Sequence, residues 1–181
     1  MMDRIFTSWL MRQEADWADF APKTDRVKVT PVGVGAPCRK YVAEFDCGGL
    51  VRQSDGAITR AEEFVIGIYF GDDHLRRVEP MQLVWLLSPT NVWHPNIKAP
   101  TVCLGHLRPA VGLIEILNQA YSILTYQNVS PGDCLNEEAA SWSRAHRDQF
   151  PIDRRPLKRR DIRLNIREVP SHEPDSAVAA P

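Results

Sequence analysis

A short stretch near the middle of the chain gathers side chains that could perform covalent chemistry. Cys103 lies in it, and a cysteine that is exposed and ionised is a nucleophile. The amide of Asn96, seven residues earlier, could bind a developing oxyanion or brace the loop through a local turn. His94 and His106 flank these two residues as candidate general bases. Pro95 fixes the backbone between His94 and Asn96.

Ordinary structural explanations compete with each of these assignments. A buried structural thiol is the commoner fate of a cysteine, and a loop histidine is as often held by backbone groups. Cys103 and His106 also have the spacing of a metal-ligand pair. Two ligands are only half of what a structural zinc ion needs, so we expect no metal site.

The elements that must position these residues can be predicted from apolar periodicity. Residues 88–112 show none, and we expect an irregular segment there, of a length that is often functional in compact domains. A helix is predicted over residues 4–20, where apolar side chains recur at offsets of three and four. Gln13 is the one polar break in that pattern.

Between that helix and the irregular segment we predict four strands joined by short turns, which is typical of an antiparallel meander. Their approximate ranges are 27–32, 39–47, 64–70 and 83–87. The second strand alternates cleanly, and Gly48-Gly49 after it indicates a bulge or a turn. The fourth is apolar on both faces, which predicts a buried strand.

Two helices are predicted after the irregular segment. The first covers residues 113–126 and is strongly apolar. The second begins after Asn136, a good N-cap residue, and runs to about Phe150. The elements together predict an α+β domain.

The motif His94-Pro95-Asn96-Ile97, followed after a short spacer by Val102-Cys103-Leu104, resembles the active-site signature of ubiquitin-conjugating enzymes. These enzymes carry ubiquitin or a ubiquitin-like protein as a thioester. Asp133-Cys134-Leu135-Asn136 is similar to the acidic loop of that family, and the predicted elements follow its order over residues 4–150. The resemblance implies the UBC-like fold, with an N-terminal helix, a four-stranded antiparallel meander, an active-site loop and two C-terminal helices.

The resemblance also implies roles for individual residues. Cys103 would accept the modifier by thioester exchange. Asn96 would stabilise the oxyanion, or hold the loop that does so. Asp133 would position or deprotonate the incoming amine. A thioester is already activated, so a positioned electrophile and a desolvated amine suffice without a strong base at the cysteine.

Other residues of the motif would have supporting roles. His94 and Pro95 would shape the loop, and His94 would not act as a general base. Asn128 and Leu135 would line the cleft beside the cysteine. His106, three residues after Cys103, would tune the reactivity of the thiol, which is a hypothesis specific to this chain.

Departures from the family pattern indicate a particular branch. The spacer before the cysteine is short, and Tyr69-Phe70-Gly71-Asp72-Asp73-His74 stands where the family usually has Tyr-Pro-x-x-Pro. The chain is therefore similar to divergent bacterial conjugating enzymes associated with antiphage defence operons. The implied partners are a ubiquitin-like protein, an activating-type enzyme and an acceptor protein. ATP is used by the activating enzyme, so no cofactor is expected in this chain.

Two other functions remain open from the sequence. The chain could be an inactive UBC-like scaffold, or a cysteine hydrolase that pairs Cys103 with His94 or His106. A hydrolase needs an imidazole within hydrogen-bond reach of the sulfur. Lys98, five residues before Cys103, is a candidate for self-modification.

Composition excludes several classes of protein. The 181 residues carry a formal charge of −1, which argues against a dedicated nucleic-acid binder. No apolar run is long enough to cross a membrane, and the N-terminal residues lack the pattern of a secretory signal. The four cysteines are scattered, which favours free thiols in a reducing compartment and a cytoplasmic location.

The chain divides into one domain and an extension. We expect a conjugating domain over residues 1–150, a basic extension over 151–169 and a disordered tail over 170–181. Arg and Lys concentrate in residues 154–167, either as a solvated edge or as a docking surface for an acidic partner. An alternation around residues 162–166 predicts a short strand.

Overall fold

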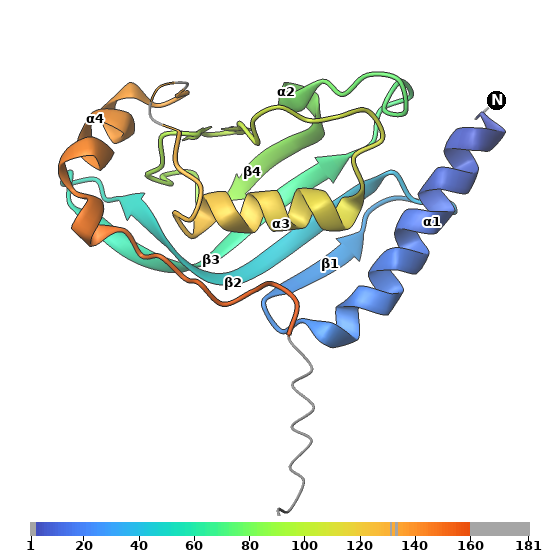
Figure 1. Cartoon of the computed structure of the whole chain (residues 1–181), viewed down its shortest axis with the longest axis horizontal. Coiled ribbons are helices and arrows are strands. Elements are labelled where there is room, and N and C mark those ends of the chain that lie inside the picture. The colour runs from blue at the N-terminus through green and yellow to red at the C-terminus, as the bar shows by residue number, and fades with distance from the viewer. Residues whose placement is uncertain (1–2, 131, 133, 160–181) are drawn as a thin grey trace, which may run out of the picture.

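The chain folds as a sheet with helices packed against it, as the computed structural model in Figure 1 shows. The structure describes residues 3–130, 132 and 134–159. The α-helices are α1 (Arg4–Phe20), α2 (Pro80–Leu83), α3 (Leu113–Leu124) and α4 (Glu137–Ala145). The strands are β1 (Val27–Pro31), β2 (Lys40–Arg52), β3 (Ile58–Tyr69), β4 (Val84–Ser88), β5 (Ile97–Lys98) and β6 (Thr101–Val102). Two 3₁₀ turns cover Ala21–Lys23 and Arg147–Gln149.

The six strands form one antiparallel sheet in the order β1-β2-β3-β4-β6-β5. The long β2–β3 ladder shifts register between Asp46 and Gly49, which confirms the predicted bulge. A Cβ on Gly49 would lie 2.5 Å from the ring of Phe64 and 2.8 Å from the carbonyl oxygen of Leu124. Glycine therefore lets strand β2 approach the end of helix α3 at this point.

Helix α3 lies across one face of the sheet and supplies much of the core (Figure 1). The predicted alternation on β2 is confirmed, because its apolar side chains are buried while Glu44 and Asp46 are exposed. The buried set of β2 is Tyr41, Ala43, Phe45 and Cys47. Residues spaced three and four apart on α3 fill the facing side, as predicted for this helix. These residues are Leu113, Ile116, Leu117, Ala120, Ile123 and Leu124.

Several expectations from the sequence are wrong in detail. Strand β2 continues to Arg52 and strand β3 begins at Ile58, so the long hairpin exceeds the predicted ranges 39–47 and 64–70, and the short helix α2 was not predicted. Strand β4 is not buried on both faces, because Leu87 points away from the core and is 49% exposed. Residues 88–112 are not wholly irregular, since they form the two-residue strands β5 and β6. Helix α4 ends at Ala145 rather than near Phe150, and a 3₁₀ turn follows it. Very short strands give no periodicity that a sequence pattern can detect.

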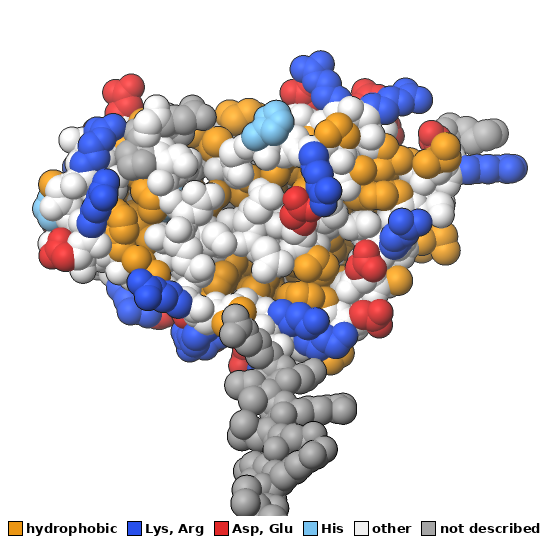
Figure 2. Space-filling model, in the orientation of Figure 1, with side chains coloured by type: hydrophobic (Ala, Val, Ile, Leu, Met, Phe, Trp, Pro, Cys, Tyr) orange, Lys and Arg blue, Asp and Glu red, His pale blue; other side chains and the backbone are white. Residues whose placement is uncertain are grey.

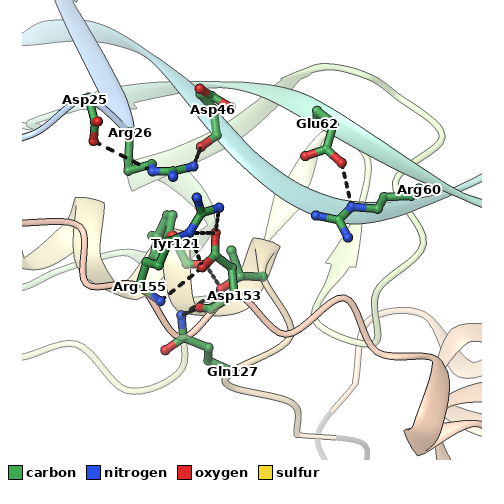
Figure 3. Close-up of polar contacts among 10 residues, drawn as sticks. Asp25, Arg26, Asp46, Arg60, Glu62, Tyr121, Gln127, Asp153 and Arg155 are labelled. Atoms are coloured by element: carbon green, nitrogen blue, oxygen red, sulfur yellow. Dashed lines mark hydrogen bonds and ion pairs between the residues drawn. The ribbon is translucent and has the colours of Figure 1, made fainter.

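Residues 151–159 run back along the domain as a strap (Figures 1 and 3). Leu157 is buried in the main core, and the backbone N–H of Arg159 donates to the carbonyl of Lys23 at 2.7 Å. The guanidinium of Arg155 binds Asp153 and lowers the pKa of that carboxyl to about 2. This part of the predicted basic extension therefore packs on the fold. The strand predicted around residues 162–166 and the tail at 170–181 lie outside the described residues.

The face of the molecule that α3 covers carries both acidic and basic side chains (Figure 2). Figure 2 shows acidic and basic side chains interspersed around the margin of that face, with a mostly neutral centre. Within the described ranges, no helix has the length and apolar character needed to cross a bilayer.

The polar break at Gln13 has a structural explanation. Helix α3 follows Gly112, which offers no side chain to cap the free N–H groups of the first turn. Gln13, buried on α1, accepts a hydrogen bond from the N–H of Leu113 at 2.8 Å. One helix thus caps another across one hundred residues of sequence.

We expect Gln13→Leu to lower the free energy of unfolding by about 1–2 kcal/mol, because it removes the acceptor from a buried helix N-terminus. Urea titration followed by circular dichroism measures this. Gln149→Leu, an exposed exchange of the same type, is the matched control. Equal midpoints for the two variants would contradict the role assigned to Gln13.

Candidate active site

The β5–β6 hairpin places Asn96 opposite Cys103. Ile97 pairs with Val102 in this hairpin. The ladder continues outward, because the N–H of Cys103 donates to the carbonyl of Asn96 at 2.9 Å. The thiol of Cys103 is free and partly exposed. The two residues that sequence reasoning placed at the centre of the site are therefore cross-strand neighbours.

His94 is fully buried and makes a hydrogen bond within its own loop. Its side chain has no exposed surface, and its Nδ1 accepts the N–H of Asn96 at 3.0 Å. Burial lowers the pKa of His94 to about 3, although the backbone of Asn128 partly opposes that shift. The ring is therefore neutral at physiological pH, and it shapes the loop through a hydrogen bond that a protonated Nδ1 could not accept.

Asn96 is almost fully buried, and its side chain braces a second loop. The carbonyl oxygen of its amide accepts the N–H of Ser130 at 3.1 Å. Among the residues that the structure describes, none accepts a hydrogen bond from the Asn96 amide nitrogen. That nitrogen therefore keeps its capacity to donate a hydrogen bond.

The carbonyl of Pro95 brings the start of helix α4 to the site. It accepts the N–H groups of Leu135 at 2.9 Å and of Asn136 at 3.0 Å. Asn136 caps α4 through the N–H of Ala139 at 3.1 Å, which confirms the predicted N-cap. The backbone of Leu135 thus lies beside Pro95, and its predicted place in a cleft stays a prediction.

Asp133 lies outside the described residues, so its proposed action on the incoming amine stays a prediction. Asn128 is exposed, and its backbone is close enough to His94 to affect the pKa of that ring. His106 is exposed on the loop after Cys103. Over the described ranges, neither His106 nor His94 makes a hydrogen bond to the Cys103 thiol, which is the contact that a cysteine hydrolase requires. The same ranges hold no group of three or more metal-ligating side chains.

Tyr126 is a site residue that the sequence did not reveal. It follows α3 with a φ of +57°, in the left-handed region, and its side chain is buried. Its hydroxyl donates to the carbonyl of Trp93, and its ring packs edge-on against His94 with the centroids 4.5 Å apart. Burial raises the pKa of Tyr126, which keeps the hydroxyl protonated as a donor. A tyrosine carries no sequence signal for a positive φ.

A second missed group connects the site to β2 and α4. The guanidinium of Arg52 stacks over the ring of Trp93 at 4.9 Å and pairs with Glu138 of α4. The backbone N–H of Trp93 donates to the backbone carbonyl of Leu50 at 2.8 Å. The residue before His94 is therefore fixed from both sides, by strand β2 and by Tyr126.

The chain was compared with known proteins. No family model and no curated protein matches it. Among solved structures, one described as a novel ubiquitin-conjugating enzyme is similar with a TM-score of 0.51 and 16% identity, over 79% of this chain and 88% of that one. The E2 domain of a Toxoplasma gondii ubiquitin conjugating enzyme has a TM-score of 0.49 and 18% identity, over 78% of this chain and 90% of that one. The first similarity shows that the chain has a UBC-like fold.

Tyr126→Phe tests the hydrogen bond from the Tyr126 hydroxyl to the carbonyl of Trp93. Removal of the hydroxyl leaves the carbonyl of Trp93 buried without its donor, so the free energy of unfolding should fall by about 1–3 kcal/mol. Tyr69→Phe is the matched control, since the Tyr69 hydroxyl has no hydrogen-bond partner in the described part of the chain. The assignment fails if the two variants unfold at the same urea concentration.

The buried neutral His94 predicts a pH dependence of stability. The unfolded chain binds a proton at His94 near the ordinary value of 6.5, whereas the folded chain does so only near 3. The stabilisation that neutral His94 gives the folded chain is therefore complete above pH 6.5. As the pH falls toward 3, the free energy of unfolding decreases by about 1.4 kcal/mol per pH unit. His94→Gln should flatten this slope of unfolding free energy between about pH 6.5 and 5.

His106→Gln is the control for that experiment, because it removes an exposed imidazole instead. Burial lowers the pKa of His74 as well, but His74 is present in both variants, so the difference between their slopes isolates His94. Parallel slopes for His94→Gln and the native chain would refute the assignment.

Proposed function

We propose that this chain is a conjugating enzyme for a ubiquitin-like protein. It accepts the C-terminal carboxyl group of the modifier from an activating-type enzyme, as a thioester on Cys103, and transfers it to an amine of an acceptor protein. The observation that carries this proposal is the position of the partly exposed Cys103 thiol directly across a hairpin from the buried amide of Asn96.

The chemistry of the site fits acyl transfer from an activated ester. The thiolate of Cys103 attacks the incoming thioester, and the thiol of the activating enzyme leaves. In the second step an amine attacks the same carbonyl carbon and loses its proton, and the Cys103 sulfur, the nucleophile of the first step, is now the leaving group. Neither step needs an imidazole base at the sulfur, and the described residues supply none by hydrogen bond.

Asn96 supplies the electrostatic part of the proposal. Its amide oxygen is occupied by the N–H of Ser130, which orients the amide and leaves the nitrogen to donate. A donor held in advance at the place where an oxyanion develops lowers the barrier without reorganising. Asp133 is proposed to receive or position the attacking amine, and Asn128 and Leu135 to border its path.

The UBC-like fold supports this function, because it is the fold of a ubiquitin-conjugating enzyme among the solved structures. The buried neutral His94 also favours a carrier over a cysteine hydrolase. A cytoplasmic, bacterial setting in antiviral defence is proposed on the sequence resemblance alone.

A synthetic peptide that ends in Gly-Gly as a mercaptoethanesulfonate thioester tests the proposal without an activating enzyme. The folded chain should form a hydroxylamine-sensitive adduct on Cys103 and release the peptide to free lysine. Intact mass measures the adduct, and chromatography measures the lysine product. We expect Asn96→Ala to slow the release about tenfold or more, because an oxyanion donor is lost.

Three controls make this experiment decisive. Cys103→Ala should abolish the adduct and the lysine product. Cys134→Ala removes the other partly exposed thiol and should leave both unchanged. The native chain unfolded in urea gives the reactivity of an unassisted thiol. A folded chain that transfers no faster than the unfolded one would reject the proposed function and favour the scaffold alternative.

A further inference from the structure

The β5–β6 hairpin presents a lysine on the same face as Cys103. Lys98 pairs with Thr101, and Ile97 pairs with Val102. Side chains alternate along a strand, so Lys98 and Cys103 share one face of the hairpin and the Ile97–Val102 pair takes the other. Burial agrees, since Ile97 is 0% and Val102 2% exposed while Lys98 is exposed.

Lys98 and Cys103 are diagonal neighbours on this face. Cys103 lies two residues beyond Thr101, the partner of Lys98, and the hydrogen bond from its N–H to Asn96 keeps it in the ladder. Diagonal neighbours across an antiparallel pair are about 7–8 Å apart, which long side chains can span. The flexible four-carbon stem of lysine gives its amine access to a group carried on the sulfur.

Lys98 is also available for reaction. In the described part of the chain, its amine has no ion pair and no hydrogen bond. The other lysines are placed elsewhere. Lys28 on β1 is 3.7 Å from Glu44, and Lys40 on β2 stacks over Tyr69 at 5.7 Å. Strand β1 is five strands away from β5 in the sheet, a separation of roughly 24 Å.

The two remaining lysines, Lys23 and Lys158, also lie near the start of β1. Arg159, the residue after Lys158, donates its backbone N–H to the carbonyl of Lys23. Both lysines therefore belong to the strap end of the domain, at the opposite side of the sheet from the hairpin. Lys98 is the one lysine of the chain that the fold places beside Cys103.

From this geometry we propose that Lys98 is an intramolecular acceptor for the acyl group on Cys103, which rests on the proposed function. The unprotonated Nζ attacks the thioester carbonyl carbon, and a C–N bond forms as the C–S bond breaks. The electron pair leaves on the Cys103 sulfur, which takes up the proton that the nitrogen loses. The products are an isopeptide on Lys98 and a free thiol on Cys103.

Transfer within one chain has a regulatory consequence. The reaction competes with transfer to another protein whenever no acceptor amine occupies the site. It leaves a permanent acyl group on the hairpin beside Cys103, where a protein-sized modifier obstructs the next round. Acyl groups that are not passed to another protein therefore accumulate on Lys98.

The Gly-Gly peptide thioester described above is the probe for this proposal. Adducts are measured by intact mass before and after hydroxylamine, which cleaves thioesters and leaves amides, and are located by peptide mapping. Once charged on Cys103 and separated from excess peptide thioester, the native chain should convert the labile adduct into a hydroxylamine-resistant adduct on Lys98 at a rate that does not change on dilution. Lys98→Arg should reduce this product about tenfold or more, because it removes a positioned nucleophile and keeps the charge.

Two matched variants complete the test. Lys40→Arg should behave as the native chain, and Cys103→Ala should give no resistant adduct. A labile adduct on Cys103 without a resistant one on Lys98 overturns this inference and leaves the proposed function intact. A resistant adduct that persists in Cys103→Ala also overturns it. So does a resistant adduct whose rate of formation from the charged chain falls on dilution. No labile adduct on Cys103 overturns the proposed function and this inference with it.

Discussion

The buried backbone carbonyls of residues 93–96 are the constraint on which the site depends. A carbonyl removed from water needs a donor, and each of these four finds one in a different part of the chain. The donors are the Tyr126 hydroxyl and the N–H groups of Ile97, of Leu135 with Asn136, and of Cys103, in that order. These five hydrogen bonds hold together the end of α3, the hairpin that carries Cys103 and the start of α4.

The same burial lowers the pKa of His94 and disfavours a proton on its ring. A charged imidazole without access to water is unfavourable, so the ring stays neutral. Its Nδ1 then accepts a hydrogen bond from the N–H of Asn96. The proposed function does not need such a base, because a thioester is already activated toward nucleophiles. Under that proposal Cys103 supplies the reactivity, and the surrounding polar groups supply position and not proton transfer.

The scaffold is held by contacts between distant segments of sequence. Gln13 on α1 caps α3, and Leu157 of the strap enters the same core. Gly49 allows β2 to pass close to the end of α3, immediately before Tyr126 leaves that helix in a left-handed conformation. The surface ion pairs, by comparison, contribute little to stability, since exposed pairs are screened by water and salt. The core and the buried polar caps therefore set where the site lies.

The sequence by itself located α1, α3 and the start of α4, and the parts of the four longer strands where apolar side chains alternate, because apolar periodicity is a local signal. It also determined that Asn136 would cap α4. Only the tertiary structure decided which groups meet across long separations. The cap from Gln13 to Leu113 and the support from Tyr126 to Trp93 both arise when distant segments pack. Hydrogen bonds between such segments leave no periodic trace in the residues that make them, so their pairing is fixed by the fold as a whole.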